Sequence, residues 1–303
     1  MNKATVIGTG NLGSCIAYEI ANRGLVDELV LIDIYRELAE GNAADIAQAM
    51  ALRRNVNVVA GDYKDIDGSK VIVVTAGKPR TPDMKSRMEL LRTNAKIIAN
   101  VASSLKRVKG NPVIVTLTNP VDVMNYVMWK STGFNRRKVL GSAGMLDSAR
   151  FRTVLAKRLG AQPNNIEAYV IGEHGANQVP VFSRAKIKGQ KIRFTREERL
   201  QILEELRQSA LEVISKKGAT IFAPANNTVN MIQMIMKDEK KTAVCSTVLN
   251  GEYGLNGLSI GVPVVLGGNG VEKILEWDLD EEEKAAFYNG AKNLKEAVKT
   301  VGE

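Results

Sequence analysis

The chain has 303 residues, of which 45% are hydrophobic and 25% charged, and its formal net charge is +9. This composition is typical of a soluble globular protein, and the length predicts two domains or one large one. Aromatic residues make up only 5% of the chain, which argues against a nucleic-acid surface built on base stacking. The default interpretation of the net charge is a solvated basic surface, whose field would also favour small anionic substrates.

The sequence carries no pattern typical of secretion, membrane insertion or metal binding. No apolar run approaches the roughly 18 residues that a spanning helix needs, and the first strand is expected too close to Met1 to leave room for a signal peptide. The two cysteines, Cys15 and Cys245, fall in different predicted elements without metal-ligand spacing, as expected in a reducing compartment. We therefore expect a cytoplasmic protein with no metal site and no membrane contact.

A glycine-rich turn follows the first predicted strand, residues 4–7, and precedes a predicted helix over residues 14–23. Its sequence, GTGNLG, is the pattern G-x-G-x-x-G in the strand-to-helix context that dinucleotide binding requires. Gly8 would make the tight turn, Gly10 would let a pyrophosphate approach the backbone, and Gly13 would let helix and strand pack closely. The start of the helix would offer free N–H groups to phosphate.

An acidic residue, Asp33, ends the second predicted strand, 20 residues after Gly13. A carboxylate at this place can accept both ribose hydroxyls of an adenosine and repels a 2′-phosphate, which favours NAD over NADP. Arg36 lies nearby and could soften this preference. The alternative is that Asp33 caps the next helix.

Strands and helices alternate through the first half of the chain. Further strands are predicted over residues 56–60, 70–75, 113–117 and 138–140, and helices over 38–53 and 88–108. This alternation predicts an α/β fold with a doubly wound parallel sheet. We expect an N-terminal Rossmann domain over residues 1–141 and a C-terminal α+β substrate domain over residues 142–303.

Two loops at predicted strand ends hold polar residues. The first, residues 76–87, carries Arg80 and Arg87 seven residues apart, and is either a solvated basic loop or a lid that closes over an anion. In the second, residues 118–122, Asn119 either caps the following helix or presents its amide to a substrate oxygen.

His174 is the only histidine of the chain, and it lies between two glycines after an apolar run, residues 166–171, that we predict as a strand. An imidazole readily gives and takes a proton near neutral pH, but a histidine in a tight turn can also be purely structural. Asp147 and Arg150 are three residues apart on one predicted helical face. They could be a capping aspartate and a surface arginine. Alternatively, Asp147 pairs with His174 and Arg150 faces a ligand carboxylate.

The rest of the second half shows weaker patterns. We predict a hairpin over residues 185–194, a helix that opens with a capping box at Thr195 and Glu198, and a helix from Pro224 to Met236. Strands are expected over residues 242–249 and 258–266, and a last helix from Asp280.

The motifs GTGNLG, TAG-x-PR, TNPVDV, LDSARF, GEHG and LNGEYG, together with Asp33, occur in one order along the chain. In this combination the sequence resembles the L-lactate and malate dehydrogenase family. The PR form of the first loop is similar to the malate branch, because the lactate branch usually has glutamine where Arg80 stands. The resemblance implies a malate dehydrogenase of the tricarboxylic acid cycle that is a homotetramer or a dimer; the alternative is an L-lactate or broad 2-hydroxyacid dehydrogenase.

The resemblance also implies a role for each polar residue of the site. His174 would take the hydroxyl proton of the substrate and return it in the reverse reaction, and Asp147 would orient it. Arg150 would bind the 1-carboxylate of malate or oxaloacetate, Arg80 the distal carboxylate, and Arg87 would polarise the C2 carbonyl.

Two more residues, Asn119 and Thr220, would lie near the substrate oxygen and the nicotinamide. NAD would contact Gly8, Gly10, Asn11, Leu12, Gly13, Asp33, Thr75, Ala76, Gly77, Asn94 and Asn119.

The chain departs from the family pattern twice. The loop PRTPDMKSR is one residue longer than the usual PRKPGMSR, which makes Lys78 and Lys85 rivals to Arg80. After GEHG the usual acid is replaced by Ala176-Asn177. From other classes, an NAD-dependent glycosidase would need a cysteine and histidine metal site that this chain cannot build, and a non-catalytic NAD-binding protein would not need the proton carrier.

Overall fold

The computed structural model describes residues 2–79 and 87–302, without the side chains of residues 87, 210 and 302. In the first half, parallel strands lie in the order β3-β2-β1-β4-β5-β6. Their bounds are Lys3–Ile7 (β1), Glu28–Ile32 (β2), Asn57–Ala60 (β3), Val71–Val74 (β4), Val113–Thr116 (β5) and Val139–Gly141 (β6). This order confirms the predicted doubly wound Rossmann sheet.

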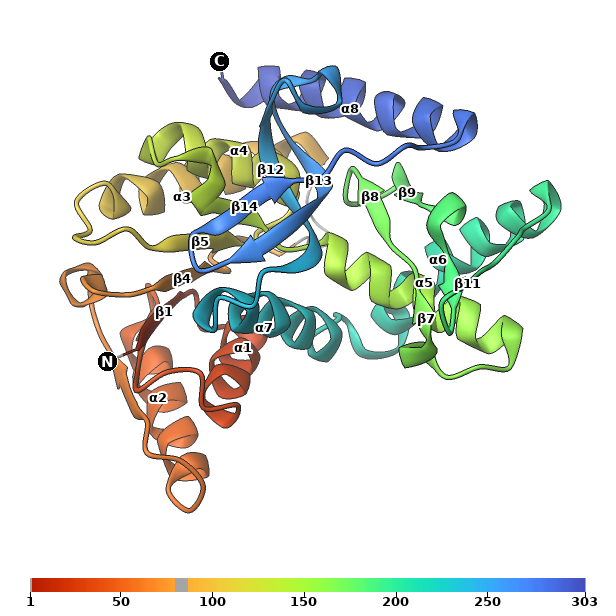
Figure 1. Ribbon diagram of the computed structural model, residues 1–303. Coiled ribbons are helices and arrows are strands. Elements are labelled where there is room, and N and C mark those ends of the chain that lie inside the picture. Colours follow the sequence, from red (N-terminus) through yellow and green to blue (C-terminus); the bar gives the residue numbers. More distant parts are fainter. Residues whose placement is uncertain (1, 80–86, 303) are drawn as a thin grey trace.

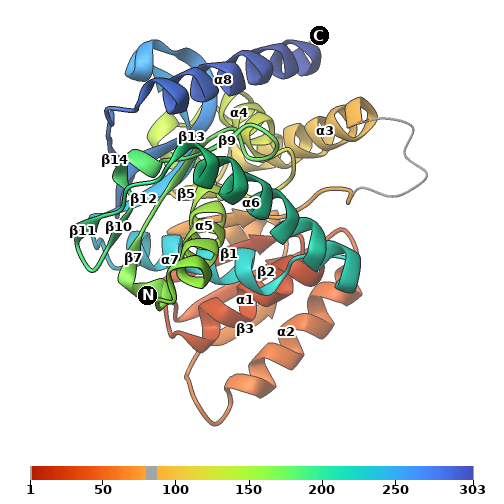
Figure 2. The ribbon, with the colours of Figure 1, turned by 90° about the vertical axis from the view of Figure 1, so that its right-hand side faces the viewer.

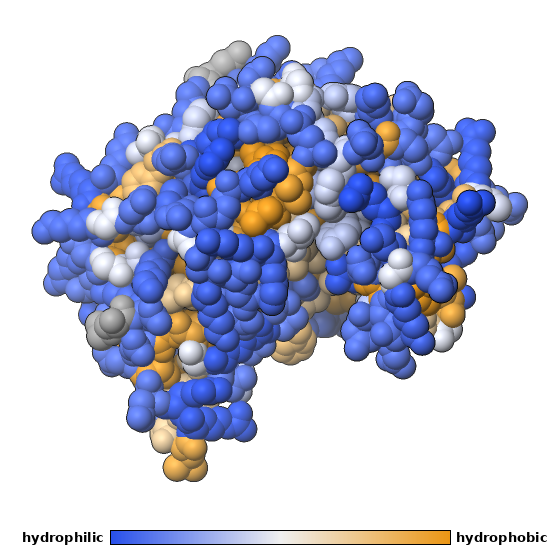
Figure 3. All heavy atoms as spheres, in the orientation of Figure 1, coloured by the Kyte–Doolittle hydropathy of each residue, from blue (hydrophilic) through white to orange (hydrophobic). Residues whose placement is uncertain are grey.

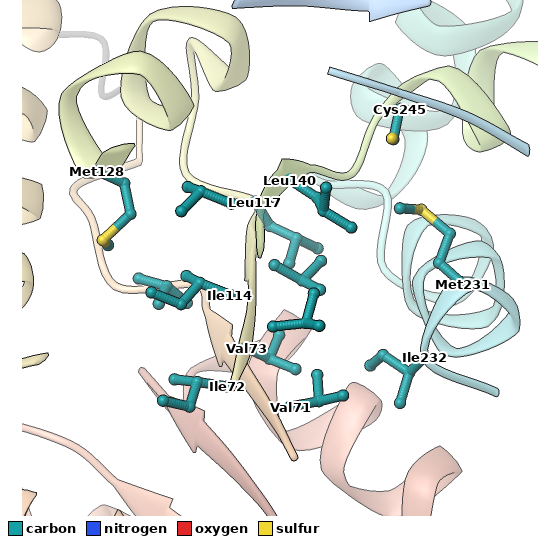
Figure 4. Close-up of a cluster of buried hydrophobic side chains, with 14 of the residues drawn as sticks. Val71, Ile72, Val73, Ile114, Leu117, Met128, Leu140, Met231, Ile232 and Cys245 are labelled. Carbon is teal, nitrogen blue, oxygen red and sulfur yellow. The ribbon is translucent and has the colours of Figure 1, made fainter. Parts of the chain in front are cut away.

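Helices cover both faces of this sheet. They are α1 (Asn11–Asn22), α2 (Arg36–Met50), α3 (Arg87–Leu105), α4 (Val121–Thr132) and α7 (Phe222–Met236). Figure 4 shows Met128 of α4 on one side of the strands and Met231 and Ile232 of α7 on the other. Strand β4 is buried along its whole length, as its uninterrupted apolar sequence predicts. One face of the Rossmann sheet is thus completed by a helix from the second half, which also packs on α1.

The sheet does not end at the predicted domain boundary. Residue Gly141 of β6 pairs with Ser246 of the antiparallel strand β12, so the hydrogen-bonded order continues as β12-β13-β8-β9, with β14 on β13. These strands are Lys241–Asn250 (β12), Asn256–Gly267 (β13), Gly270–Ile274 (β14), Val170–Gly172 (β8) and Gln178–Pro180 (β9). Within the described residues this makes one sheet of 11 strands. The division at residue 141 stays a prediction.

The apolar run over residues 166–171 is not one strand, and that prediction was wrong. Its start, β7 (Ile166–Glu167), pairs with β10 (Lys186–Ile187), whereas its end forms β8 of the large sheet. At the start of β8, the N–H of Val170 donates to Ser148 Oγ at 2.9 Å instead of to a neighbouring strand. The run divides because it serves two cores: Ile166 lies in a small hydrophobic cluster with Phe182, and Ile171 in the main one.

The small cluster holds the remaining elements of the second half together. Helices α5 (Gly144–Leu159) and α6 (Arg196–Lys217) pack beside a three-stranded sheet of β7, β10 and β11 (Gln190–Lys191), on the right in Figure 1. The predicted capping box opens α6, because Thr195 Oγ1 accepts from the N–H of Glu198 at 3.2 Å and the Glu198 carboxylate accepts from the N–H of Thr195 at 2.7 Å. Short 3₁₀ turns lie at Tyr63–Ile66, Arg136–Lys138, Pro163–Asn165, Phe182–Arg184 and Glu252–Gly254.

The last helix, α8 (Glu281–Gly302), runs across the top of the molecule in both ribbon views (Figures 1 and 2). Its first-turn residue Glu283 accepts from the N–H of Ser183 at 2.8 Å and from its hydroxyl at 2.7 Å. The face in Figure 3 is mostly hydrophilic, with apolar side chains gathered near its centre.

Two glycines of the GTGNLG turn differ in the space around them. A methyl group at Gly13 would lie 1.9 Å from the carbonyl oxygen of Gly8, whereas one at Gly10 would meet nothing within 4 Å. Gly8 itself has φ +93°, where a side chain is strained. Gly13 is therefore needed for packing and Gly10 is not.

We predict that Gly13→Ala destabilises the fold and that Gly10→Ala does not. The new methyl in Gly13→Ala must push β1 and α1 apart, at a cost of about 1–3 kcal/mol. Gly10→Ala should change the free energy of unfolding by no more than about 0.5 kcal/mol, as at an open surface position. Thermal unfolding of both variants, followed by circular dichroism, measures the difference; equal midpoints would contradict the packing role of Gly13.

Candidate active site

The single histidine and the predicted aspartate meet in the folded chain. His174 follows β8, and its Nδ1 lies 2.7 Å from Asp147 Oδ2 in the first turn of α5. The Asp147 side chain is 4% exposed and that of His174 is 21% exposed. Because an ionised carboxylate only accepts, Nδ1 carries the proton of the neutral ring. Nε2 is then the nitrogen that can take up or release a second proton.

The surroundings of His174 set its protonation. Burial lowers the pKa of His174, but the charge of Asp147 and its hydrogen bond outweigh burial and leave the pKa above its ordinary value. The nearby Asp122 carboxylate acts in the same direction, and Arg150 acts against it. The ring can thus exchange a proton near neutral pH and is stabilised as an imidazolium.

Asp147 also bonds Arg150, whose Nη1 lies 3.1 Å from Asp147 Oδ1. The N-cap of α5 is Ala143, so Asp147 is not a capping residue, and the second of the two predicted interpretations is the one the geometry favours. A guanidinium has five N–H donors, so one such bond leaves Arg150 able to bind a carboxylate as well.

The sequence did not point to a second buried carboxylate, Asp122, behind the histidine. Its Oδ2 accepts the backbone N–H of His174 at 2.8 Å and its Oδ1 accepts the hydroxyl of Ser246 at 2.5 Å. Burial raises the pKa of Asp122 to about 6, although both hydrogen bonds lower it. An acid in the first turn of a helix is common for reasons of the helix dipole, so only its burial and its distant partners mark it as part of the site.

The glycine turn presents a surface that suits a pyrophosphate. Helix α1 begins with Asn11, Leu12 and Gly13, and no side chain caps it, because Gly10 is the N-cap. The first N–H groups of the helix are therefore available to an anion. The open space at Gly10 lets phosphate oxygens come close to the backbone.

Asp33 lies directly after β2, beside this turn. Its Oδ2 accepts the N–H of Thr9 at 2.6 Å, and its Oδ1 accepts the N–H of Tyr35 at 3.0 Å. The N-cap of α2 is Tyr35, so Asp33 does not cap that helix. The Arg36 guanidinium bonds the Glu40 carboxylate at 2.8 Å, so its positive charge is paired with an acid other than Asp33. The Asp33 carboxylate keeps lone pairs for ribose hydroxyls. Together with the glycine turn, Asp33 fits an NAD molecule.

The ends of β4 and β5 are fastened to each other and to the glycine turn. Thr75 Oγ1 donates to the carbonyl of Gly8 at 2.7 Å, and Thr118 Oγ1 donates to the carbonyl of Ala76 at 2.7 Å. Gly77 is exposed beside them.

Asn94 connects the same loops from α3. It is 1% exposed; its Oδ1 accepts the N–H of Lys78 at 2.8 Å, and its Nδ2 donates to the carbonyls of Lys78 and Asn119 at 3.2 and 2.8 Å. Both N–H donors and the oxygen of this amide bond backbone groups, so in this geometry Asn94 positions loops that would contact the cofactor.

Asn119 is exposed and does not cap α4, whose N-cap is Pro120 after a cis peptide bond. The capping interpretation was therefore wrong, since the turn places Asn119 one residue too early. Its contact with a substrate oxygen stays a prediction.

Four residues predicted for the site, or as rivals for a role in it, are not placed there by the described part of the structure. Arg80 and the rival Lys85 lie outside the described residues, and Arg87 is known only as the first residue of α3. Thr220 is half-buried between α6 and α7, and its contact with a substrate stays a prediction. Where the family acid is missing after GEHG, Asn177 Nδ2 donates to Glu173 Oε2 at 2.5 Å.

The described residues show no other kind of centre. Over residues 2–79 and 87–302, no helix combines the length and apolar character needed to cross a bilayer. The same residues contain no cluster of three or more acidic, histidine or cysteine side chains suited to a metal ion.

Comparison with known proteins identifies one family over nearly the whole chain. Residues 2–141 match the family model for the lactate/malate dehydrogenase NAD binding domain, and residues 144–303 the model for the alpha/beta C-terminal domain of that family. A malate dehydrogenase from Natronomonas pharaonis is 41% identical over 297 residues, 97% of each chain. L-lactate dehydrogenase 2 from Lactococcus lactis subsp. lactis is 36% identical over 308 residues, 99% of this chain and 98% of the relative.

A solved structure is similar over its full length. Lactate dehydrogenase from Cryptosporidium parvum, crystallised with lactic acid and β-nicotinamide adenine dinucleotide, is 35% identical and superimposes with a TM-score of 0.94, covering 100% of this chain and 98% of that one. The Rossmann half with its glycine turn and Asp33 is the NAD-binding domain of this family, and NAD is the cofactor. The chain belongs to the lactate/malate dehydrogenase family of NAD-dependent oxidoreductases.

Proposed function

We propose that the protein is a malate dehydrogenase that interconverts (S)-malate and oxaloacetate, with His174 as the proton acceptor and donor. The observation that carries this proposal is the His174–Asp147–Arg150 cluster, in which a proton carrier lies beside a cation for a carboxylate. The glycine turn and Asp33 would hold NAD, which would supply the acceptor or donor of the hydride at the carbon that bears the hydroxyl group.

In this proposal, different residues transfer the proton, bind the carboxylate and stabilise the C2 oxygen. Nε2 of His174 takes the hydroxyl proton as malate is oxidised, and Asp147 stabilises the imidazolium that forms. Arg150 binds the 1-carboxylate as a planar fork, while Arg87 and Asn119 stabilise charge on the C2 oxygen. Thr220 lies close to the substrate.

Malate is favoured over lactate by two observations. The malate dehydrogenase relative is 41% identical and the lactate dehydrogenase relative 36%, and the loop sequence has Arg80 where the lactate branch usually has glutamine. We assign Arg80 to the distal carboxylate. A lactate or broad 2-hydroxyacid dehydrogenase is the alternative, and initial rates with oxaloacetate and pyruvate decide between them. A cytoplasmic location, a dimeric or tetrameric state and a place in the tricarboxylic acid cycle stay predictions.

Replacing the proton carrier tests the mechanism. His174→Asn should lower kcat for oxaloacetate reduction by at least about 100-fold, the usual contribution of general acid–base catalysis. NADH binding, measured by fluorescence titration, should persist because the cofactor rests on the other half of the chain. Nearly unchanged turnover in a folded, NADH-binding variant would show that another group carries the proton.

Replacing the distal arginine tests the substrate. Arg80→Gln should lower kcat/KM for oxaloacetate by about 30- to 5000-fold, which corresponds to about 2–5 kcal/mol for leaving a buried charge unpaired. Its relative activity on pyruvate should rise. Lys78→Gln and Lys85→Gln are matched controls from the same loop; if one of them, and not Arg80→Gln, lowered oxaloacetate turnover, that lysine would be the discriminator.

A further inference from the structure

A buried acid, Asp122, bonds the main chain of the proposed catalytic histidine, whereas Asp147 bonds its ring. Asp122 is the second residue of α4 and is 2% exposed. Both of its oxygens accept hydrogen bonds, one from the backbone of His174 and one from the side chain of Ser246 on β12. The two donors lie 52 and 124 residues away along the chain, so the acid fastens three distant elements at one point.

The start of a helix does not by itself explain this acid. An exposed acid in the first turn serves the helix dipole equally well, as Glu197 does at the second position of α6. Burying a carboxylate is costly unless it is hydrogen-bonded. We therefore expect that Asp122 is buried because it holds His174 and Ser246 in place.

We propose that Asp122 is a positioning residue of the active site, which fixes the main chain at His174 and whose negative charge favours the imidazolium form of the ring. This inference rests on the proposed role of His174 as the proton carrier. Asp147 holds the ring at Nδ1, and Asp122 holds the backbone from which the ring projects. The histidine is thus fixed from two directions by carboxylates of two different helices.

The charges around the pair determine the sign of the effect. Facing His174 are Asp147 and Arg150 of α5 and Asp122 of α4, with Glu173 beside it in the chain. The two aspartates raise the pKa of His174, and Arg150 lowers it. Glu173 raises the pKa of Asp122, and the charge of His174 lowers it. Removing the charge of Asp122 must therefore lower the pKa of His174.

Asp122→Asn removes the negative charge of the side chain and can keep both of its hydrogen bonds. Its amide oxygen can still accept the N–H of His174, and its amide nitrogen can donate to the hydroxyl oxygen of Ser246. Glu197→Gln is the matched control, because it neutralises an acid at the same helix position where the side chain is exposed and bonds Gln201 of its own helix.

Because His174 is the only histidine, a ¹⁵N-histidine NMR titration of the apo chain reports its pKa directly. We expect Asp122→Asn to lower this midpoint by roughly 0.5–1 unit, a modest value for a charge that contacts the backbone and not the ring, and Glu197→Gln to leave it unchanged. Reduction of a 2-oxoacid needs the protonated ring, so kcat/KM for oxaloacetate falls as pH rises through this pKa. In Asp122→Asn that fall should begin at correspondingly lower pH.

A folded Asp122→Asn variant that keeps the wild-type midpoint would overturn the inference that this charge favours the imidazolium, whether or not activity falls, since a purely structural role changes rates and not the pKa. Should Asp122→Asn fail to fold, Ser246→Ala decides: with one donor lost, Asp122 is protonated more readily, and the midpoint of His174 should fall by a smaller amount. An unchanged midpoint there would equally reject the inference. Activity that survives in His174→Asn would instead reject the proposed function.

Discussion

The site depends on one hydrogen bond, between the carboxylate of Asp147 and Nδ1 of His174 at 2.7 Å. It fixes the tautomer, leaves Nε2 as the nitrogen that can exchange a second proton and stabilises the charge that the ring acquires on protonation. The neighbouring residue secures its geometry, because Ser148 Oγ accepts the N–H of Val170 at 2.9 Å and so ties α5 to the strand that precedes the histidine. Helix α5, strand β8 and His174 are therefore linked to one another by hydrogen bonds.

The cofactor half and the histidine half are joined through the backbone of one sheet. Strand β6 ends the Rossmann order and pairs with β12, β12 carries Ser246, and Ser246 bonds the acid that holds His174. Helix α7, from the second half, completes a face of the first. The proposed reaction needs the nicotinamide and His174 at a fixed separation, and this sheet joins the two halves through paired strands.

Sequence patterns predicted the features that depend on interactions between residues close together in the chain. The glycine turn, the buried parallel strands and the capping box at Thr195 depend on neighbouring residues, and the pairing of Asp147 with His174 was available from chemistry. Two features could not be predicted, because each depends on partners distant in the sequence. These are the split of residues 166–171 between two sheets and the hydrogen bonds by which Asn94 links two loops. Asp122 was overlooked for the same reason, since an acid at a helix start looks ordinary until its burial is known.

The location of the proton in the neutral ring tests this account most directly. ¹⁵N chemical shifts of the single histidine, recorded in the apo chain above and below its titration midpoint, distinguish the two tautomers and give the pKa together. The account predicts a proton on Nδ1, an unprotonated Nε2 and a pKa above the ordinary value of 6.5. A neutral ring protonated on Nε2, or a midpoint below 6.5, would contradict it, because Asp147 would then not be holding the imidazole.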